Sequence, residues 1–189
     1  MELVNKIKRL AIIALASDEQ LIETIVLKGG NAIDLAYKGN FDTISRTSYD
    51  LDFSIEDGDF NEDELTIAER IKKVLMETFL ENDYVVLDYK FLHKPKKIRE
   101  DVADFWGGYL VTFKIIEKSK YDLFKNDLDK QRKNSVALKP DHSPVFELEF
   151  SKFECDSKEV ALSEPINYKG NLSYGECRCE GIGRITNNS

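Results

Sequence analysis

Cysteine and histidine are scarce in this sequence, and their scarcity argues against both a disulfide framework and a zinc site. The three cysteines are Cys155, Cys177 and Cys179. An odd number, with two close to the C-terminal end, does not form the disulfide framework of a small secreted protein. Together with His93 and His142, the only two histidines, they also lack the spacing of a zinc site. We therefore expect a protein of the reducing cytoplasm.

Long apolar runs are also missing. No stretch approaches the roughly 18 to 20 apolar residues that a membrane span needs. The apolar part of the N-terminal region, residues 10–16, is short and is followed by Asp18 and Glu19, which is typical of an amphipathic helix rather than a secretion signal. With 42% hydrophobic residues, eleven Phe and eight Tyr, the 189-residue chain has enough apolar side chains for the core of one soluble domain. We expect no membrane as a partner.

Positive charge is in deficit. Lys and Arg number 27 against 35 Asp and Glu, a net charge of −8, which excludes a protein that binds nucleic acid with its whole surface. The charges are uneven, because residues 50–69 carry nine acids and no base, whereas residues 90–99 carry five Lys or Arg and no acid. The basic run from Lys94 to Arg99 therefore has two interpretations, a solvated turn or a local contact with a polynucleotide.

Hydrophobic periodicity predicts an α/β fold. Helical spacing covers residues 2–17 and 61–80, and strand patterns cover 24–27, 48–55, 84–92, 107–117 and 145–151. A short helix is expected over 32–38, and residues 120–133 fit either a helix or a loop. We expect a small mixed, twisted sheet of about five strands with helices packed on it.

Side chains alternate between polar and apolar from Ser48 to Ile55. Because successive side chains of a strand point to opposite faces, Asp50 and Asp52 share one face. Their carboxylates then stand roughly 6 to 7 Å apart and can lean toward a common point. Carboxylate oxygens are hard donors, which favour Mg²⁺ or Mn²⁺ over Zn²⁺. The pattern therefore predicts a divalent-cation site, and an exposed strand face is the alternative.

A glycine pair lies about twenty residues upstream. Gly29 and Gly30 follow the apolar run 25–27 and precede the expected helix, for which Asn31 is the predicted N-cap. A strand, a glycine turn and a helix N-terminus present free backbone N–H groups and the positive end of the helix dipole, which favours an anion. An ordinary tight turn is the alternative. Beside an Asp pair, the glycines favour a site for a metal-bound nucleotide triphosphate.

The glycine pair, the short helix and the motif R-x-S-x-D-L-D-F-S at residues 46–54 resemble the signature of the nucleotidyltransferase superfamily. They are most similar to the AbiEii type, the nucleotidyltransferase toxins of bacterial abortive-infection and toxin–antitoxin systems. The resemblance covers residues 27–55 well and the rest in outline. It implies a nucleotidyltransferase core that moves an NMP from an NTP to an acceptor hydroxyl on a tRNA or a protein, with a cognate antitoxin as partner.

The resemblance also implies the catalytic residues. In the family a strand of the pattern apolar-x-apolar-E-apolar-S supplies a third carboxylate, and residues 146–151, FELEFS, place Glu149 in that position. Glu147 shares its strand face and is the alternative. Asp50, Asp52 and Glu149 are thus the expected catalytic and metal-binding residues, holding two Mg²⁺ (or Mn²⁺) ions. The residues expected to bind the nucleotide are Lys28, Gly29, Gly30, Arg46 and Ser48. Lys114, within the strand at 107–117, has two interpretations: a cation that neutralises phosphate, or a solvated lysine.

One departure from the family pattern concerns the C-terminal region. AbiEii-like chains usually continue past the third-carboxylate strand into a helical domain, whereas residues 156–189 are rich in glycine and neither helical nor apolar in pattern. We expect a nucleotidyltransferase-like domain over 1–155 and an irregular tail over 156–189, with the usual helical domain absent. The alternative function is accordingly a truncated or degenerate, non-catalytic domain that binds a nucleotide or a partner. A DxD glycosyltransferase is disfavoured, since the glycine pair and helix upstream are not part of such sites.

Overall fold

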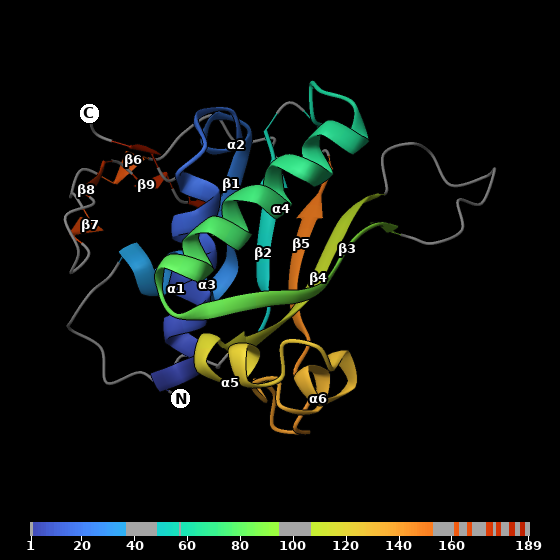
Figure 1. Ribbon diagram of the computed structural model, residues 1–189. Helices are drawn as coiled ribbons and strands as arrows, with labels where there is room; N and C mark the ends of the chain where they lie inside the picture. Colours follow the sequence, from blue (N-terminus) through green and yellow to red (C-terminus); the bar gives the residue numbers. More distant parts are fainter. Residues whose placement is uncertain are drawn as a thin grey trace.

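The computed structural model describes residues 2–36, 49–56, 58–94 and 107–152, together with six strands of two or three residues between positions 161 and 187. The helices are α1 (Glu2–Ala16), α2 (Glu19–Thr24), α3 (Gly29–Ala36), α4 (Glu64–Glu81), α5 (Lys118–Leu123) and α6 (Leu128–Lys133) (Figure 1). The longer strands are β1 (Ile25–Lys28), β2 (Leu51–Ile55), β3 (Tyr84–Lys94), β4 (Gly108–Glu117) and β5 (Phe146–Ser151). The short ones are β6 (Ala161–Leu162), β7 (Ile166–Asn167), β8 (Ser173–Gly175), β9 (Cys177–Arg178), β10 (Ile182–Gly183) and β11 (Thr186–Asn187).

The five longer strands and β10 form one six-stranded sheet in the order β10-β1-β2-β5-β4-β3. Strands β2 and β5 run parallel, and the other neighbouring pairs are antiparallel. The predicted mixed sheet with packed helices is therefore confirmed, and it is consistent with a nucleotidyltransferase-like fold. Strand β10 was not expected from the sequence, and it extends the sheet by pairing with Leu27 and Lys28 of β1.

Helices α1 and α4 cover one face of the sheet, and the core lies between these layers (Figure 1). Strand alternation sends Leu51, Phe53 and Ile55 of β2 toward the helices, each at most 2% exposed. Phe146, Leu148 and Phe150 of β5 point the same way and are fully buried. Each such side chain contributes about 1.5–3 kcal/mol when it leaves water. A shift of one residue would expose all six, so burial fixes the face on which the intervening polar residues lie.

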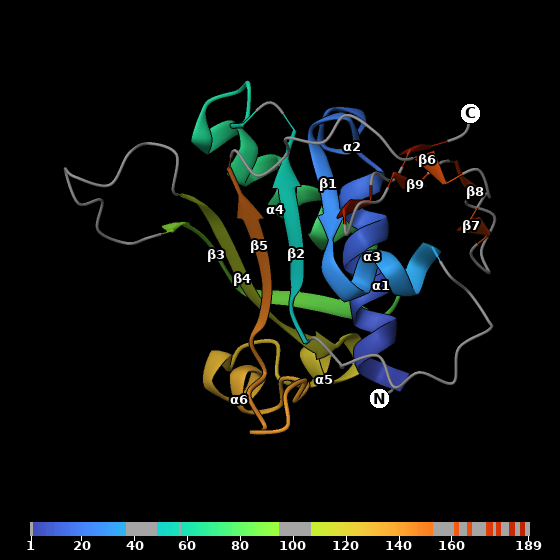
Figure 2. The same ribbon diagram turned by 180° about the vertical axis from the view of Figure 1, so that it is seen from behind.

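The opposite face of the sheet carries those polar residues. Figure 2 shows β2 and β5 from this side, with no described helix crossing them and α3 beside β1. Among the residues that the structure describes, no helix has the length and apolar character needed to cross a membrane.

Helix ends follow local capping. The Asp18 carboxylate accepts hydrogen bonds from the backbone N–H groups of Gln20 and Leu21 and starts α2. Asp63 does the same for Leu65 and Thr66, so α4 begins at Glu64, three residues later than the sequence pattern predicts.

The open question at residues 120–133 is answered by two short helices, α5 and α6, joined by a turn. In the tail, β6 pairs with β9, and β7, β8 and β11 form a three-stranded sheet. The domain boundary near residue 155 stays a prediction.

Candidate active site

Asp52 and Glu149 lie side by side on the polar face of the sheet. They are direct partners in the parallel pairing of β2 with β5, which places their Cα atoms about 4.8 Å apart. Both side chains are partly exposed, while their neighbours along each strand are buried. The alternation that buries one face of β2 and β5 thus brings together two of the three predicted catalytic carboxylates.

The surroundings of Asp52 make its carboxyl group harder to ionise. Burial raises the pKa of the Asp52 carboxyl above its ordinary value, and the negative charges of Glu149 and Asp50 raise it further. The ammonium groups of Lys28 and Lys94 act in the opposite direction. The site therefore favours the arrival of positive charge, because a cation would relieve the repulsion among the acids.

The glycine pair forms the first residues of α3 rather than a turn before it. Gly29 has a φ of +66°, which favours glycine, and it turns the chain from β1 directly into the helix. Apart from its chain neighbours and the backbone of its own helix, a Cβ built on either Gly29 or Gly30 meets no atom of the described residues within 4 Å. The start of α3 therefore presents its backbone to open space, as the anion-site interpretation requires.

Asn31 is not the N-cap of this helix, contrary to the sequence prediction, because α3 has already begun two residues earlier. Its side chain is buried and joins three elements. The Lys8 ammonium of α1 donates to Asn31 Oδ1 at 2.8 Å, and Asn31 Nδ2 donates to the backbone oxygen of Asp50 at 3.0 Å. Asn31 thereby fixes the start of β2 relative to the glycine pair, a positioning role that the sequence analysis missed.

Lys28 is the last residue of β1 and lies on the same sheet face as Asp52. Because Leu27 pairs with Phe53, the next residue along β1 stands beside Asp52. Its ammonium also donates to the hydroxyl of Ser151, at 3.3 Å, on the far side of β2. The structure therefore brings this predicted nucleotide-binding lysine to the carboxylates.

Glu149 and Glu147 have different lysine partners. Lys94, at the end of β3, forms an ion pair with Glu149. Lys139 lies 2.8 Å from Glu147 Oε2 and 3.0 Å from Asp50 Oδ1. Burial alone would lower the pKa of the Lys139 ammonium. Its hydrogen bonds to Glu147 and Asp50 outweigh burial and hold this pKa above its usual value, so Lys139 stays charged. The sequence analysis missed Lys139, since no local pattern connects it to a carboxylate 89 positions upstream.

The remaining predicted residues fall outside this arrangement. Lys114 donates to the Asp88 carboxylate at 2.9 Å, which assigns it a structural ion pair rather than a phosphate contact. Arg46, Ser48 and residues 95–99 of the basic run lie outside the described residues, so their roles stay predictions.

A comparison with known protein families identifies the family of this chain. Residues 12–144 match the family model described as nucleotidyl transferase AbiEii toxin, type IV TA system, which is more than half of the chain. The chain belongs to the AbiEii nucleotidyl transferase toxin family. The resemblance proposed from residues 27–55 is thereby confirmed. No curated protein and no solved structure matches the chain.

The AbiEii match includes the glycine pair, both aspartates and Lys139, but it ends before β5. The placement of Glu149 beside Asp52 therefore rests on the strand pairing of this chain. The family description names a nucleotidyltransferase toxin of a type IV toxin–antitoxin system, which implies an antitoxin as partner.

The donor set of this AbiEii-family site fits a magnesium ion that also keeps water or phosphate ligands. Within the described ranges, no three His, Cys, Asp or Glu side chains are grouped closely enough to hold a metal ion by themselves. Mg²⁺ commonly takes only one or two protein carboxylates and completes its shell with water and substrate phosphates. Asp52 and Glu149 supply such a pair of hard oxygen ligands.

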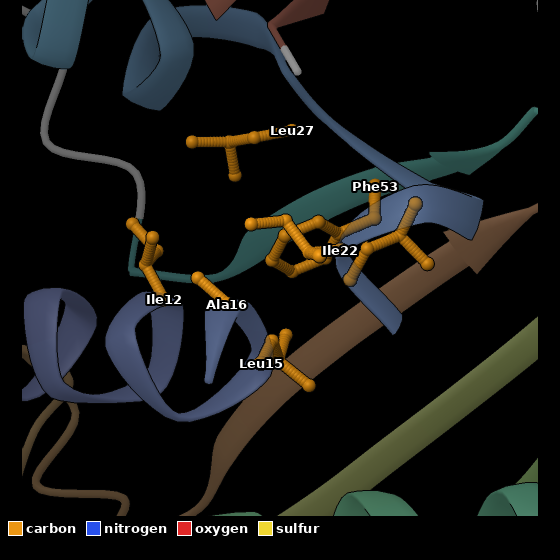
Figure 3. Close-up of a pocket in the computed structure, with 7 residues that line it drawn as sticks. Ile12, Leu15, Ala16, Ile22, Leu27 and Phe53 are labelled. Carbon is orange, nitrogen blue, oxygen red and sulfur yellow. The ribbon is translucent and has the colours of Figure 1, made fainter. Parts of the chain in front are cut away.

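A hollow on the other side of the sheet is apolar and unrelated to these carboxylates. It is lined by Ile12, Leu15, Ala16, Ile22, Ile25, Leu27 and Phe53 (Figure 3). Leu27 and Phe53 adjoin Lys28 and Asp52 in sequence, and strand alternation points them toward α1 and α2 instead. None of the described residues that line the hollow carries a polar side chain, so the hollow belongs to the core.

Proposed function

We propose that this AbiEii-family chain moves an NMP from an NTP to an acceptor hydroxyl, on a tRNA or a protein, as the toxin of a toxin–antitoxin or abortive-infection pair. The observation that carries the proposal is the pairing of Asp52 with Glu149 on the open sheet face, next to Lys28 and the glycine-led start of α3. A structural sheet face has no need of two directly adjacent acids, one of which has its pKa raised by burial and by the charge of the other.

The phosphates of the nucleotide are assigned to the glycine side of the site. The free backbone N–H groups at the start of α3 and its dipole favour negative charge, and Gly29 and Gly30 leave room for close approach. Lys28 adds a cation at the same place. Arg46 and Ser48 precede β2 in sequence, and we propose that they complete the triphosphate site.

The proposed metal ligands are Asp50, Asp52 and Glu149. When bound there, Mg²⁺ or Mn²⁺ would neutralise the triphosphate and stabilise charge on the attacking and leaving oxygens. The oxygens of the two paired carboxylates suit either ion.

The transfer itself makes one P–O bond and breaks another. The acceptor oxygen bonds to the α-phosphorus, the bond from that phosphorus to the bridging oxygen of the β-phosphate breaks, and pyrophosphate leaves. Asp52 is our candidate for accepting the hydroxyl proton, because it is the central carboxylate of the site, between Lys28 on β1 and Glu149 on β5. Lys28 and Lys94 would face the charge that develops on pyrophosphate.

A specific observation supports a second candidate, a non-catalytic nucleotide- or partner-binding domain. Three acids of the polar face already have lysine partners: Lys139 bridges Asp50 and Glu147, and Lys94 pairs with Glu149. A face neutralised by its own lysines would bind a magnesium–nucleotide complex weakly.

Label transfer separates the two candidates. The protein is incubated with each labelled NTP, Mg²⁺, and either a tRNA mixture or a cell protein mixture, and labelled acceptor and pyrophosphate are measured. We expect transfer that falls by orders of magnitude in Asp52→Asn and is unchanged in Asp122→Asn, a matched control on the exposed side of α5. Undiminished transfer in Asp52→Asn would remove Asp52 from the mechanism. A rise in melting temperature with Mg²⁺–NTP but no transfer to either mixture would favour the binding domain.

A further inference from the structure

The acids of the polar face fall into two groups. Asp52 and Glu149 are direct partners across β2 and β5. Asp50 lies two residues before Asp52, just ahead of β2, and Glu147 lies two residues before Glu149 in β5, and the Lys139 ammonium lies between them. Asp50 Oδ1, the atom that faces Lys139, is buried from solvent. A positive charge therefore already occupies the place between these two carboxylates.

Lys139 is held in that place by a tight turn. The backbone N–H groups of Leu138 and Lys139 both donate to the Ser143 oxygen, and the His142 N–H donates to the Lys139 oxygen at 2.9 Å. Leu138, only 3% exposed, anchors the turn in the core. The Lys139 side chain is 20% exposed, against 51% for Lys94. Lys94 thus reaches Glu149 from the solvent, whereas Lys139 is enclosed between its two partners.

We infer that Lys139 is a positioning residue whose ammonium group takes the second cation position of the site, between Asp50 and Glu147, so that the protein accepts one divalent ion, at Asp52 and Glu149. This inference rests on the proposed function, and it reassigns Asp50 from a metal ligand to a partner of Lys139.

Competition for the same oxygens is the physical reason. A magnesium ligand must approach to 2.0–2.1 Å with near-octahedral geometry. An ammonium group at hydrogen-bond distance from both Asp50 and Glu147 leaves no room for such an ion between them, and its charge repels one nearby. The single ion at Asp52 and Glu149 would still find enough ligands, because phosphates and water complete its shell.

Counting bound ions tests the inference. Metal-free protein is titrated with Mn²⁺ alone, and the number of ions bound is obtained by calorimetry and by electron paramagnetic resonance. We expect one ion for wild type and two for Lys139→Met, which keeps side-chain length but removes the charge. Lys139→Arg, which keeps the charge, should bind one ion. Lys94→Met is the matched control: it also removes a lysine paired with an acid of this face, and it should bind one ion, because Glu149 belongs to the first position.

Asp50→Asn keeps the test decisive if Lys139→Met does not fold. On our assignment, the affinity of the single ion should change by less than about threefold in Asp50→Asn, and on the order of tenfold or more in Asp52→Asn. Two Mn²⁺ ions in wild type, one ion in a folded Lys139→Met, or equal losses in Asp50→Asn and Asp52→Asn would each overturn the inference. Wild type that binds no Mn²⁺ would instead reject the metal dependence in the proposed function, and the inference with it.

Discussion

Replacing Gly30 with alanine separates the folding role of the glycine pair from its binding role. Gly30 lies in the first turn of α3, is exposed, and has no atom within 4 Å of the position that a Cβ would take. The added methyl group therefore clashes with none of the residues that the structure describes. It does enter the space in front of the helix N-terminus, where our proposal places a phosphate.

The expected effect on stability is small and favourable. Alanine is up to about 1 kcal/mol better than glycine inside a helix, and about half of that applies near an end. For a chain of this size, about 0.5 kcal/mol raises the melting temperature by about 1–2 °C. Gly29→Ala should behave in the opposite way, because Gly29 has a φ of +66° and a left-handed alanine costs roughly 1–2 kcal/mol.

Gly30→Ala should weaken nucleotide binding even though it does not lower stability. A phosphate oxygen must come within about 3 Å of a backbone nitrogen to accept its hydrogen bond, and a methyl group beside that nitrogen obstructs the approach. We expect Gly30→Ala to melt at or above the wild-type temperature and to bind Mg²⁺–NTP at least about tenfold more weakly, as measured by calorimetry. Unchanged affinity in a folded Gly30→Ala would refute the assignment of phosphate to the start of α3.

Two further changes test the sheet that carries the site and the ion pairs around it. Gly108→Ala should cost about 3 kcal/mol or more, because its Cβ would lie 1.9 Å from the Phe150 backbone oxygen and would force β4 away from β5; a wild-type midpoint in urea denaturation would show that these strands are not so close. Asp88→Asn should cost about 1 kcal/mol at pH 7, since Asp88 pairs with Arg132 and Lys114, while asparagine tolerates its φ of +52°. The hydrogen bond from Arg132 lowers the pKa of Asp88, so its contribution is present above the ordinary value of 3.8 and is lost as pH falls through the lower, folded-state pKa. The difference in urea midpoints between wild type and Asp88→Asn should therefore shrink in acid, and a difference independent of pH would contradict the ion-pair explanation.

Strand parity explains why part of the site was predictable. The faces of β2 and β5 follow from alternation within each strand, because apolar residues on one side require the core there. Asp52 and Glu149 could thus be placed on an open face without knowing the fold. Alternation does not say which strands are neighbours in the sheet. The prediction that Asp52 and Glu149 belong to one site therefore depended on the family resemblance.

The start of α3 shows where a local pattern gave the wrong answer. Asn31 is a good N-cap residue by composition, but Gly29 adopts a positive φ and allows the helix to begin directly after β1. Asn31 then becomes a buried link between Lys8 and the backbone of Asp50. Both partners are distant in sequence, so no local pattern near Asn31 indicated these contacts, and the preference of asparagine for helix caps decided the prediction.

The pairing of acids on the polar face with lysines was the feature least predictable from the sequence. The acids of residues 50–69 and the bases of residues 90–99 were visible as separate runs, but of these bases only Lys94 pairs with an acid of the polar face in the described structure. The cation between Asp50 and Glu147 comes instead from Lys139, placed by a turn that closes on Ser143. Two neighbouring acids on a sheet face predict a metal site. When an ammonium group is held between them, we expect that group, and not a metal ion, to occupy the place between the two carboxylates. On our inference, the number of ions that such a face binds depends on contacts made by the tertiary fold, which motif spacing does not show.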